Sequence, residues 1–315
     1  MTSPDPPVVN LDELDSRHVE VGHLRADWTF VGSAAGCVDV GMRRIRVEPG
    51  WFATPQHVHA HDEETFYVLG GSGLSVQDDK TYAVRPGDCI VHREAGEAHT
   101  LRAGPDGLDA LAFGHSRERS SGARLPRIGM TWTARSWFPT GEGPSPFERE
   151  AELGPPDTPE PSDRPASIVN ADDVDAQTGD RENHRGTWRR LGSTAGARRT
   201  GLNQISLEPG QMAAPPHCHS AEEEIFVVLD GTGTLLLGDD EHPVKPHDVI
   251  ARPAGTGIAH AFRAGDDGLT FLAYGAREPN DICYYPRSNK IAFRGVGVLT
   301  RLENLDYWDG ESIDE

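Results

Sequence analysis

The chain has 315 residues, a length that suggests two domains, each large enough to bury a hydrophobic core. Hydrophobic residues make up 36% and charged residues 25%, which is the composition of a folded protein rather than a disordered one. The 30 basic and 50 acidic side chains give a net charge of −20. We therefore expect neither nucleic acid nor an anionic membrane as a partner.

The sequence also bears on the compartment of the protein. The N-terminal residues contain no basic region followed by an apolar stretch, as a secretory signal would. No apolar run approaches the roughly 20 residues that cross a bilayer. The four cysteines are widely spaced and fit reduced thiols. We expect a cytoplasmic protein.

In chain order, the first half of the chain contains short runs rich in Val, Ile, Phe and Tyr, each bounded by Gly, Pro or Asp. These runs are RRIRVEPG (43–50), TFYVLGGSGLSVQ (65–77), KTYAVRPGDCIVH (80–92) and AHTLRAG (98–104). This pattern predicts the strands of an all-β sandwich or barrel. The segments GGSG (70–73) and DGTG (230–233) lie between strand patterns and open no helix, so we expect hairpin turns there rather than nucleotide-binding loops.

An internal repeat divides the chain. VVNLDELD at 8–15 returns as IVNADDVD at 168–175, and EETFYVLGGSG at 63–73 returns as EEIFVVLDGTG at 223–233. Residues 141–165 contain seven prolines, which predicts an extended linker. We therefore expect an N-terminal domain over residues 1–140, a linker over 141–165 and a C-terminal domain over 166–315. The aromatic tail from residue 278 is expected to pack back on a domain.

Each unit carries the same arrangement of histidines and one glutamate. Two histidines stand at positions i and i+2, so in a strand they point to the same face. A glutamate follows five residues later, after a polar turn, and a third histidine begins a later strand. Three imidazoles and one carboxylate suit a first-row divalent metal ion. The candidate ligands are His57, His59, Glu64 and His99 in the first unit, and His217, His219, Glu224 and His260 in the second.

Alternatives exist for these residues and their neighbours. A single His-x-His pair is more often a polar surface or a satisfied core pair, and its recurrence in both units is what favours metal. The neighbouring acids Glu63, Glu222 and Glu223 are expected to face solvent. His61 and His92 are expected at exposed turns, with a role as proton shuttle as the alternative.

The motifs GWFATPQHVHAHDEETFYVLGG (50–71) and GQMAAPPHCHSAEEEIFVVLDG (210–231) resemble the first conserved motif of the cupin family. PGDCIVHREAGEAH (86–99) and PHDVIARPAGTGIAH (246–260) resemble the second. The resemblance implies a bicupin, with two double-stranded β-helix (jelly-roll) barrels in tandem, short flanking helices and a tail. It places the metal ligands on the eight residues named above. Arg93, His247, Ala103 and Ala264 depart from the family pattern at turns and pocket walls rather than at ligands.

The expected function is that of a divalent-metal-dependent enzyme acting on a small organic substrate. We favour an iron-dependent dioxygenase or related oxidoreductase, because four protein ligands leave coordination positions open for substrate and dioxygen. A decarboxylase or isomerase on the same ligands is the first alternative, and a non-catalytic metal-binding barrel the second. Iron is the favoured ion, with Mn, Ni, Co and Zn as alternatives and one ion per domain. A homodimer is an open alternative to the monomer.

Overall fold

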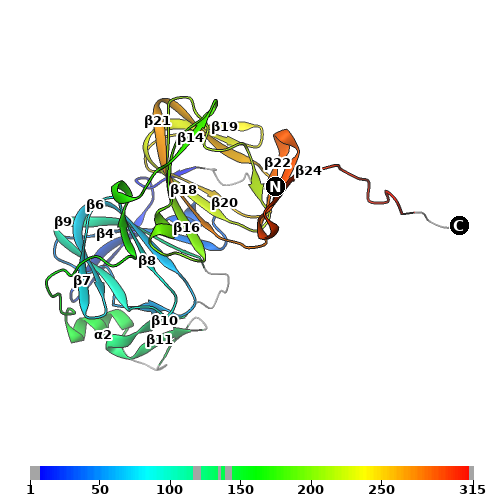
Figure 1. Ribbon diagram of the computed structural model, residues 1–315. Helices are drawn as coiled ribbons and strands as arrows, with labels where there is room; N and C mark the ends of the chain where they lie inside the picture. The colour runs from blue at the N-terminus through cyan, green and yellow to red at the C-terminus, as the bar shows by residue number, and fades with distance from the viewer. Residues whose placement is uncertain (1–7, 116–121, 134–135, 139–143, 312–315) are drawn as a thin grey trace.

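The computed structural model describes residues 8–115, 122–133, 136–138 and 144–311. Two β-barrels lie side by side, each with one eight-stranded and one four-stranded sheet (Figure 1). The named strands pair antiparallel throughout, for example β6 with β9 and β18 with β21. The expected all-β, tandem jelly-roll architecture is confirmed.

The first barrel is built around one large sheet with the order β13-β8-β6-β9-β4-β3-β2, and β7 pairs with β6. Its small sheet has the order β12-β11-β10-β5. The large-sheet strands are β2 (Ser16–Val21), β3 (Leu24–Phe30), β4 (Val40–Val47), β6 (Glu64–Gln77), β7 (Lys80–Val84), β8 (Asp88–His92), β9 (His99–His115) and β13 (Ile168–Asn170). The small-sheet strands are β5 (Val58–His59), β10 (Ala123–Leu125), β11 (Met130–Thr133) and β12 (Ser136–Phe138).

The second barrel repeats this plan, with the large-sheet order β1-β20-β18-β21-β16-β15-β14 and β19 paired with β18. Its small sheet has the order β17-β22-β23-β24. The large-sheet strands are β1 (Val9–Asn10), β14 (Gln177–Arg181), β15 (His184–Arg189), β16 (Thr200–Leu207), β18 (Glu224–Leu237), β19 (Asp240–Val244), β20 (Asp248–Arg252) and β21 (His260–Ala276). The small-sheet strands are β17 (Cys218–His219), β22 (Ile282–Tyr285), β23 (Lys290–Phe293) and β24 (Val298–Arg301).

The first strand of each half lies in the sheet of the other half. β1 pairs with β20 through Val9 and Val249, and β13 pairs with β8 through Ile168 and Ile90. At the end of β1 the Asn10 amide donates to Asp248 Oδ1 at 2.8 Å. The repeated VVN and IVN segments therefore bind the two barrels together. The expected domain bounds at residues 140 and 166 divide the chain by sequence and do not describe this exchange of strands.

The glycine-rich segments 70–73 and 230–233 are not hairpin turns, so that expectation is wrong. Both lie inside long strands, β6 and β18, whose pairing with β9 and β21 shifts register at these points. Gly71 has φ +74°, and a Cβ there would lie 2.2 Å from the Gly107 carbonyl oxygen. The glycines thus form β-bulges that bend one continuous strand around the barrel.

The linker contains a helix that we did not expect. α2 (Pro146–Leu153) begins with a capping box, in which Ser145 and Glu148 bond each other's backbone N–H, and with proline at its first position. The signal Ser-Pro-x-Glu was present in the sequence. The other helices are short: α1 (Val31–Ala34), α3 (Leu191–Thr194), η1 (Pro126–Ile128), η2 (Ala171–Asp173), η3 (Pro286–Ser288) and η4 (Arg294–Val296).

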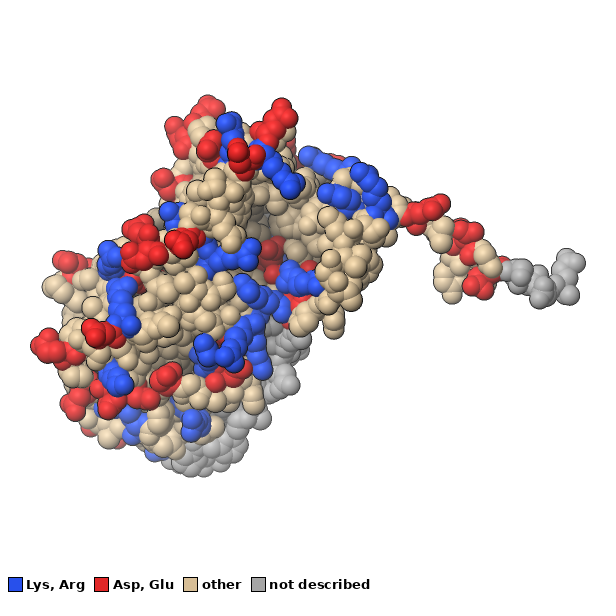
Figure 2. All heavy atoms as spheres, in the orientation of Figure 1, with Lys and Arg blue, Asp and Glu red and all other residues tan. Residues whose placement is uncertain are grey.

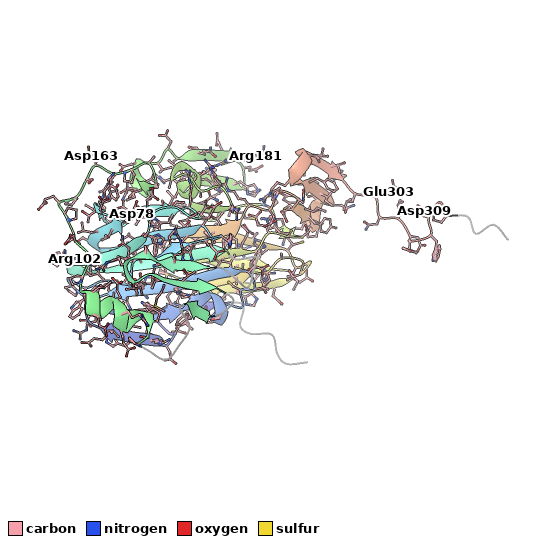
Figure 3. All side chains as sticks on the ribbon, turned by 90° about the horizontal axis from the view of Figure 1, so that it is seen from below. Asp78, Arg102, Asp163, Arg181, Glu303 and Asp309 are labelled. Carbon is pink, nitrogen blue, oxygen red and sulfur yellow. The ribbon has the colours of Figure 1, made fainter. Side chains whose placement is uncertain are left out.

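The tail differs along its length. Residues 282–301 form β22, β23 and β24 in the small sheet of the second barrel. Beyond them the chain extends away from the body, with Glu303 and Asp309 on the projecting segment (Figure 3). Tyr307 is 85% and Trp308 61% exposed, so the expected packing of the tail does not reach these residues. Among the described residues, no helix is long and apolar enough to cross a membrane.

The two barrels share a hydrophobic core. Each barrel has an internal cluster, around Phe66 in the first and Phe226 in the second. A third cluster spans both halves, and within it the rings of Phe113 and Tyr274 stack with centroids 4.9 Å apart. The shared cluster fixes one barrel against the other.

On the surface, basic side chains gather around a hollow where the barrels meet, on the face shown in Figure 2.

Candidate metal centres

In the first barrel the four candidate ligands converge at one end of the large sheet. His57 pairs with His99 through an isolated bridge, and Glu64 begins β6 after the polar turn. One ligand atom from each of His57, His59, Glu64 and His99 lies within 4.8 Å of the others. The structure therefore brings together the four residues that the sequence suggested. Their role as metal ligands remains a prediction.

Glu64 is the centre of this group. Its Oε2 lies 2.8 Å from His99 Nε2, 3.4 Å from His59 Nε2 and 3.6 Å from His57 Nε2. Burial opposes ionisation of this carboxyl, but the charge of His59 and the close approach of the three imidazoles outweigh it and hold its pKa well below the usual value. The carboxylate is therefore the ionised form in which a metal would bind it.

The orientation of two rings fits a metal ion. His57 Nδ1–H donates to the Pro55 carbonyl at 3.0 Å, and His99 Nδ1–H donates to the Glu97 carbonyl at 3.2 Å. In the neutral ring this leaves the Nε2 lone pair facing the carboxylate of Glu64. Acceptors that face each other need a proton or a cation between them. A divalent ion would satisfy all four groups at once, so the donor set fits such an ion.

The second barrel builds a related group from equivalent elements, but only His217, Glu224 and His260 have ligand atoms that all lie within 4.8 Å of one another, and His219 groups with other residues instead. His217 pairs with His260 through an isolated bridge, and Glu224 begins β18. Glu224 Oε2 lies 3.1 Å from His260 Nε2 and 3.4 Å from His219 Nε2. It is buried and makes no hydrogen bond within the part of the chain that the structure describes. An unpartnered buried carboxylate oxygen is the feature that a bound cation would satisfy.

Three further residues join this second group and were not expected from the sequence. Asp281 Oδ2 accepts a hydrogen bond from His219 Nδ1–H at 2.7 Å, which fixes the ring with Nε2 toward Glu224. Cys283 lies within 4.8 Å of both His217 and His219, measured between ligand atoms, and Glu222 forms a similar group with His219 and Asp281. Asp281 and Cys283 lie in the tail, where β22 brings Cys283 beside β17, so the histidine motif itself does not indicate them.

Burial and charge shift the titration of the second group. Burial and the neighbouring charge of His260 lower the pKa of His217 to about 4. For Glu224, burial opposes ionisation, yet the close approach of His260 and the charges of the histidines lower the pKa to about 2. Burial and the charge of Glu224 raise the pKa of Glu222 to about 7. A neutral His217 and an ionised Glu224 are protonation states that metal binding requires.

The acids next to the candidate ligands do not face solvent, so that expectation is wrong. Glu63 is 1% and Glu223 3% exposed. Each reaches into the opposite barrel. Glu223 accepts hydrogen bonds from the backbone N–H groups of Val38, Asp39 and Val40 at 2.6–2.7 Å. Glu222 is 8% exposed and ion-pairs with Arg294.

Glu63 makes the reciprocal contact with the second barrel. It accepts from the backbone N–H groups of Arg198 and Thr200 at 2.9 and 3.2 Å, and from the Thr200 hydroxyl at 2.5 Å. Strand alternation predicts solvent for Glu63 when only one barrel is considered. The neighbouring barrel takes the place of solvent, which no pattern within one repeat indicates.

His92 differs from expectation as well, because it is buried rather than at an exposed turn. It is 3% exposed, and its ring stacks on His99 with centroids 3.7 Å apart and planes at 4°. Burial, followed by the charge of His99, lowers its pKa well below the usual value. His61 is exposed, as expected. His92 thus supports a candidate ligand as a neutral ring.

A cavity of about 460 Å³ adjoins the second group. Glu224 and Glu222 line it, together with three arginines from separate segments: Arg190, Arg277 and Arg294. This volume falls in the range of small-molecule sites. The arrangement places a candidate metal ligand and several guanidinium groups around one space.

Comparison with known proteins agrees with this architecture. A family model described as a cupin domain matches residues 43–111 and 203–273. The solved structure of an oxalate decarboxylase from Lactobacillus farciminis is 15% identical with a TM-score of 0.57, over 87% of this chain and 87% of that one. Another, from Bacillus subtilis, is 15% identical with a TM-score of 0.55, over 87% and 78%.

A shorter protein matches part of the chain. A cupin-superfamily sugar phosphate isomerase from Silicibacter pomeroyi is 29% identical over 42% of this chain and 91% of that one, with a TM-score of 0.39. A comparison with curated proteins finds no match. Because a cupin domain is matched in each half of the chain, the protein is a bicupin.

Proposed function

We propose that the protein is a divalent-metal-dependent enzyme that acts on a small organic anion, with its reacting centre in the second barrel. The observation that carries the proposal is the cavity of about 460 Å³ that has Glu224 and three arginines in its wall. A metal ion would bind an oxygen of the substrate, and a guanidinium would bind its carboxylate. The two contacts are complementary, since each places negative charge beside a cation.

The four ligands in this barrel would be His217, His219, Glu224 and His260. A bound divalent ion would supply a Lewis acid that polarises the substrate oxygen. The chain itself does the positioning. Arg277 and Arg294 would hold the anionic group of the substrate, and the hydrogen bond from His219 to Asp281 keeps that ring aligned.

Iron-dependent dioxygenation is the first reaction class to test. Three imidazoles and one carboxylate are ligands that suit Fe(II), and four protein ligands leave positions for substrate and dioxygen at an octahedral ion. Manganese, nickel, cobalt and zinc suit the same donors.

Decarboxylation or isomerisation is the second candidate, and the position of Glu222 favours it. Glu222 lines the same cavity as Glu224 and contacts Arg294. A carboxyl group beside the bound substrate would donate or accept a proton without any external oxidant. The two candidates share ligands and differ in whether dioxygen is consumed.

Elemental analysis of anaerobically purified protein, followed by turnover assays on a panel of small carboxylates, tests the proposal. Dioxygen uptake with bound iron would support the oxygenase, and carbon dioxide or isomer formed without dioxygen would support the second candidate. The double variant His217→Ala/His219→Ala should lose activity, while His57→Ala/His59→Ala is the matched control in the other barrel. Absence of bound metal after reconstitution, or full activity in the second-barrel variant, would refute the proposal.

A further inference from the structure

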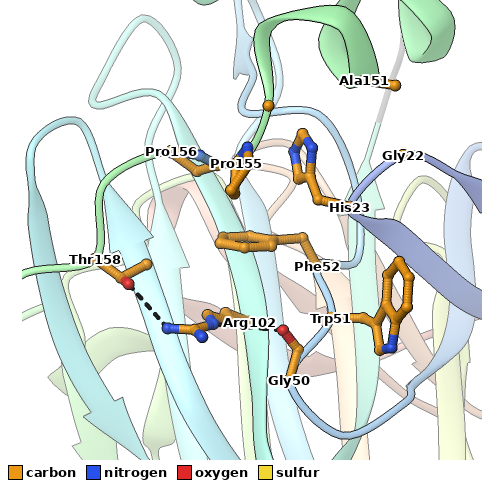
Figure 4. Close-up of a pocket in the computed structure, with 11 residues that line it drawn as sticks. Gly22, His23, Gly50, Trp51, Phe52, Arg102, Ala151, Pro155, Pro156 and Thr158 are labelled. Carbon is orange, nitrogen blue, oxygen red and sulfur yellow. Dashed lines mark hydrogen bonds between the residues drawn. The ribbon is translucent and has the colours of Figure 1, made fainter.

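The first barrel has a second cavity, of about 520 Å³, that lies apart from the candidate metal ligands. It lies between the barrel and the linker segment that follows α2 (Figure 4). Its floor comes from the barrel and its cover from residues 151–158. The polar and aromatic side chains in its wall are His23, Trp51, Phe52, Arg102 and Thr158. The volume is that of a site for a small organic molecule.

Arg102 provides the positive charge of this cavity. Its guanidinium lies over the ring of Phe52, 5.7 Å from the centroid, and its Nη1–H donates to the Thr158 hydroxyl at 2.8 Å. Across the described ranges of the chain, no carboxylate pairs with it, and its hydrogen bonds go to neutral oxygens, those of Thr158 and Gly50. A guanidinium has five N–H donors, so donors remain for an anion. Arg102 is thus held in place by neutral groups.

The walls beside Arg102 are flat and apolar. The ring of His23 stands edge-on to Phe52, with centroids 5.3 Å apart and planes at 88° (Figure 4). His23 Nδ1 is buried and has no hydrogen-bond partner among the residues that the structure describes. Pro155 and Pro156 lie beside His23, on the side of the Phe52 ring away from Arg102, and Trp51 also lines the cavity (Figure 4). Such walls accept a planar apolar group.

The cover of the cavity is firmly attached. Gly22 packs so closely on α2 that a Cβ there would lie 2.3 Å from the Ala151 Cβ. Glu150 on the same helix is fully buried, contacts Arg127 and lies 3.7 Å from His23 Nε2. The cavity is therefore preformed rather than a gap under a loose segment.

The equivalent place in the second barrel lacks each of these features. The Phe52–Arg102 bridge corresponds to a bridge between Met212 and Arg263. There Arg263 is neutralised by Glu241 at 2.9 Å. By strand register, Thr81 takes the place of Glu241 in the first barrel, and its hydroxyl instead donates to the Pro159 carbonyl of the linker at 2.7 Å.

The aromatic walls also belong to the first barrel alone. Trp51 and Gln211 occupy equivalent positions, as their backbone bonds to Ala103 and Ala264 show. The two copies of one ancestral unit thus differ in three respects at this place: an arginine without a carboxylate, aromatic walls and a covering linker.

From this geometry we propose that the cavity binds a small organic anion with a planar apolar body, such as an aromatic carboxylate. The carboxylate accepts hydrogen bonds from Arg102, and the ring lies between Phe52, Trp51 and the prolines of the linker. The site is independent of metal binding and of the reaction proposed for the second barrel.

Titration with benzoate tests this site, by calorimetry and by the NMR resonance of the Trp51 indole N–H. We expect one site in the first barrel with a dissociation constant of about 1 mM or tighter. Arg102→Gln should weaken binding at least about tenfold, because the charge-assisted hydrogen bonds are lost. Arg263→Gln, at the equivalent position of the second barrel, is the matched control and should bind as the wild type does. Benzyl alcohol and acetate, which lack the charge or the ring, should bind more weakly than benzoate.

Two further variants keep the outcome unambiguous. Trp51→Gln introduces the residue found in the second barrel and should weaken benzoate without unfolding the protein. Arg294→Gln removes an arginine of the second cavity, so it separates binding there from binding in the first barrel. No perturbation of Trp51 at 10 mM benzoate (about tenfold above the expected constant) would overturn the proposal. Unchanged affinity in Arg102→Gln, or loss of affinity only in Arg294→Gln, would overturn it as well.

Discussion

Replacing Glu223 by alanine should destabilise the whole protein, because this side chain belongs to one barrel and is bound by the other. Its carboxylate accepts three backbone N–H groups, of Val38, Asp39 and Val40, at 2.6–2.7 Å. It is 3% exposed, so water would not replace these bonds without opening the interface between the barrels. The alanine variant would leave the buried Val40 N–H without an acceptor, together with the N–H groups of Val38 and Asp39, whose residues are exposed.

The size of the effect follows from these contacts. Hydrogen bonds to a charged group contribute about 1.5–3 kcal/mol each, but three bonds to one carboxylate are not additive. The substitution leaves neutral N–H donors rather than an unpaired charge, so we expect a total loss of about 2–4 kcal/mol. For a chain of this size such a loss corresponds to a fall in Tm of roughly 5–15 °C. Glu223→Gln keeps one acceptor oxygen and should lie between alanine and wild type.

Differential scanning calorimetry measures this loss. Glu208→Ala is a matched control from the same barrel, since Glu208 is 57% exposed and pairs with Arg185 at 3.5 Å, a surface contact that contributes at most about 1 kcal/mol. The neighbouring residue Glu224 begins β18, so we also expect weaker metal binding in Glu223→Gln. A free energy of unfolding for Glu223→Ala within about 1 kcal/mol of wild type would refute the reasoning.

Three further predictions concern other parts of the chain. Asp281→Asn should weaken metal binding in the second barrel about 10–100-fold in a chelator competition, because the imidazole of His219 loses its charged partner; equal affinity would contradict this role. Gly22→Ala should lower the free energy of unfolding by about 1–3 kcal/mol, since φ is +61° and the new Cβ would meet Ala151; an unchanged Tm would contradict the contact. Hydrogen bonding to His247 lowers the pKa of Asp12 from 3.8 to about 2, so its stabilising contribution is complete above pH 3.8 and is lost as the pH falls toward 2. Asp12→Asn should therefore flatten the acid limb of a stability–pH profile, and an identical profile would exclude this contribution.

The sequence predicted those features that a single repeat determines. His57 and His59 share a face by strand alternation, and the polar turn returns Glu64 to the same end of the barrel, so convergence of the set followed from local geometry. The capping box at Ser145 is equally local, but the prolines around it favour an extended chain. The sequence pattern therefore predicts a linker where this helix forms.

Features that depend on contact between the repeats were not predictable in the same way. Glu63 follows a polar turn and by pattern faces outward, yet the donors that bind it come from residues 198–200 of the other half. The exchange of β1 and β13 is a second example, because nothing in VVN or IVN specifies which of two similar sheets it joins. The glycine-rich segments were misassigned since a β-bulge and a hairpin turn both require glycine at positive φ.

Both repeats carry the same candidate ligands, but the residue paired with the candidate glutamate differs between them. Opposite Glu64 in the register of the first sheet lies His92, whereas opposite Glu224 in the second sheet lies Arg252. His92 is buried and its lowered pKa keeps it neutral, while a guanidinium is charged at every physiological pH. At this one position the candidate site has a neutral neighbour in the first barrel and a cationic one in the second, while Arg43 acts on His59 from elsewhere in the first barrel. Because an anionic substrate gains more beside a cation, this difference independently favours the second barrel as the place where such a substrate reacts.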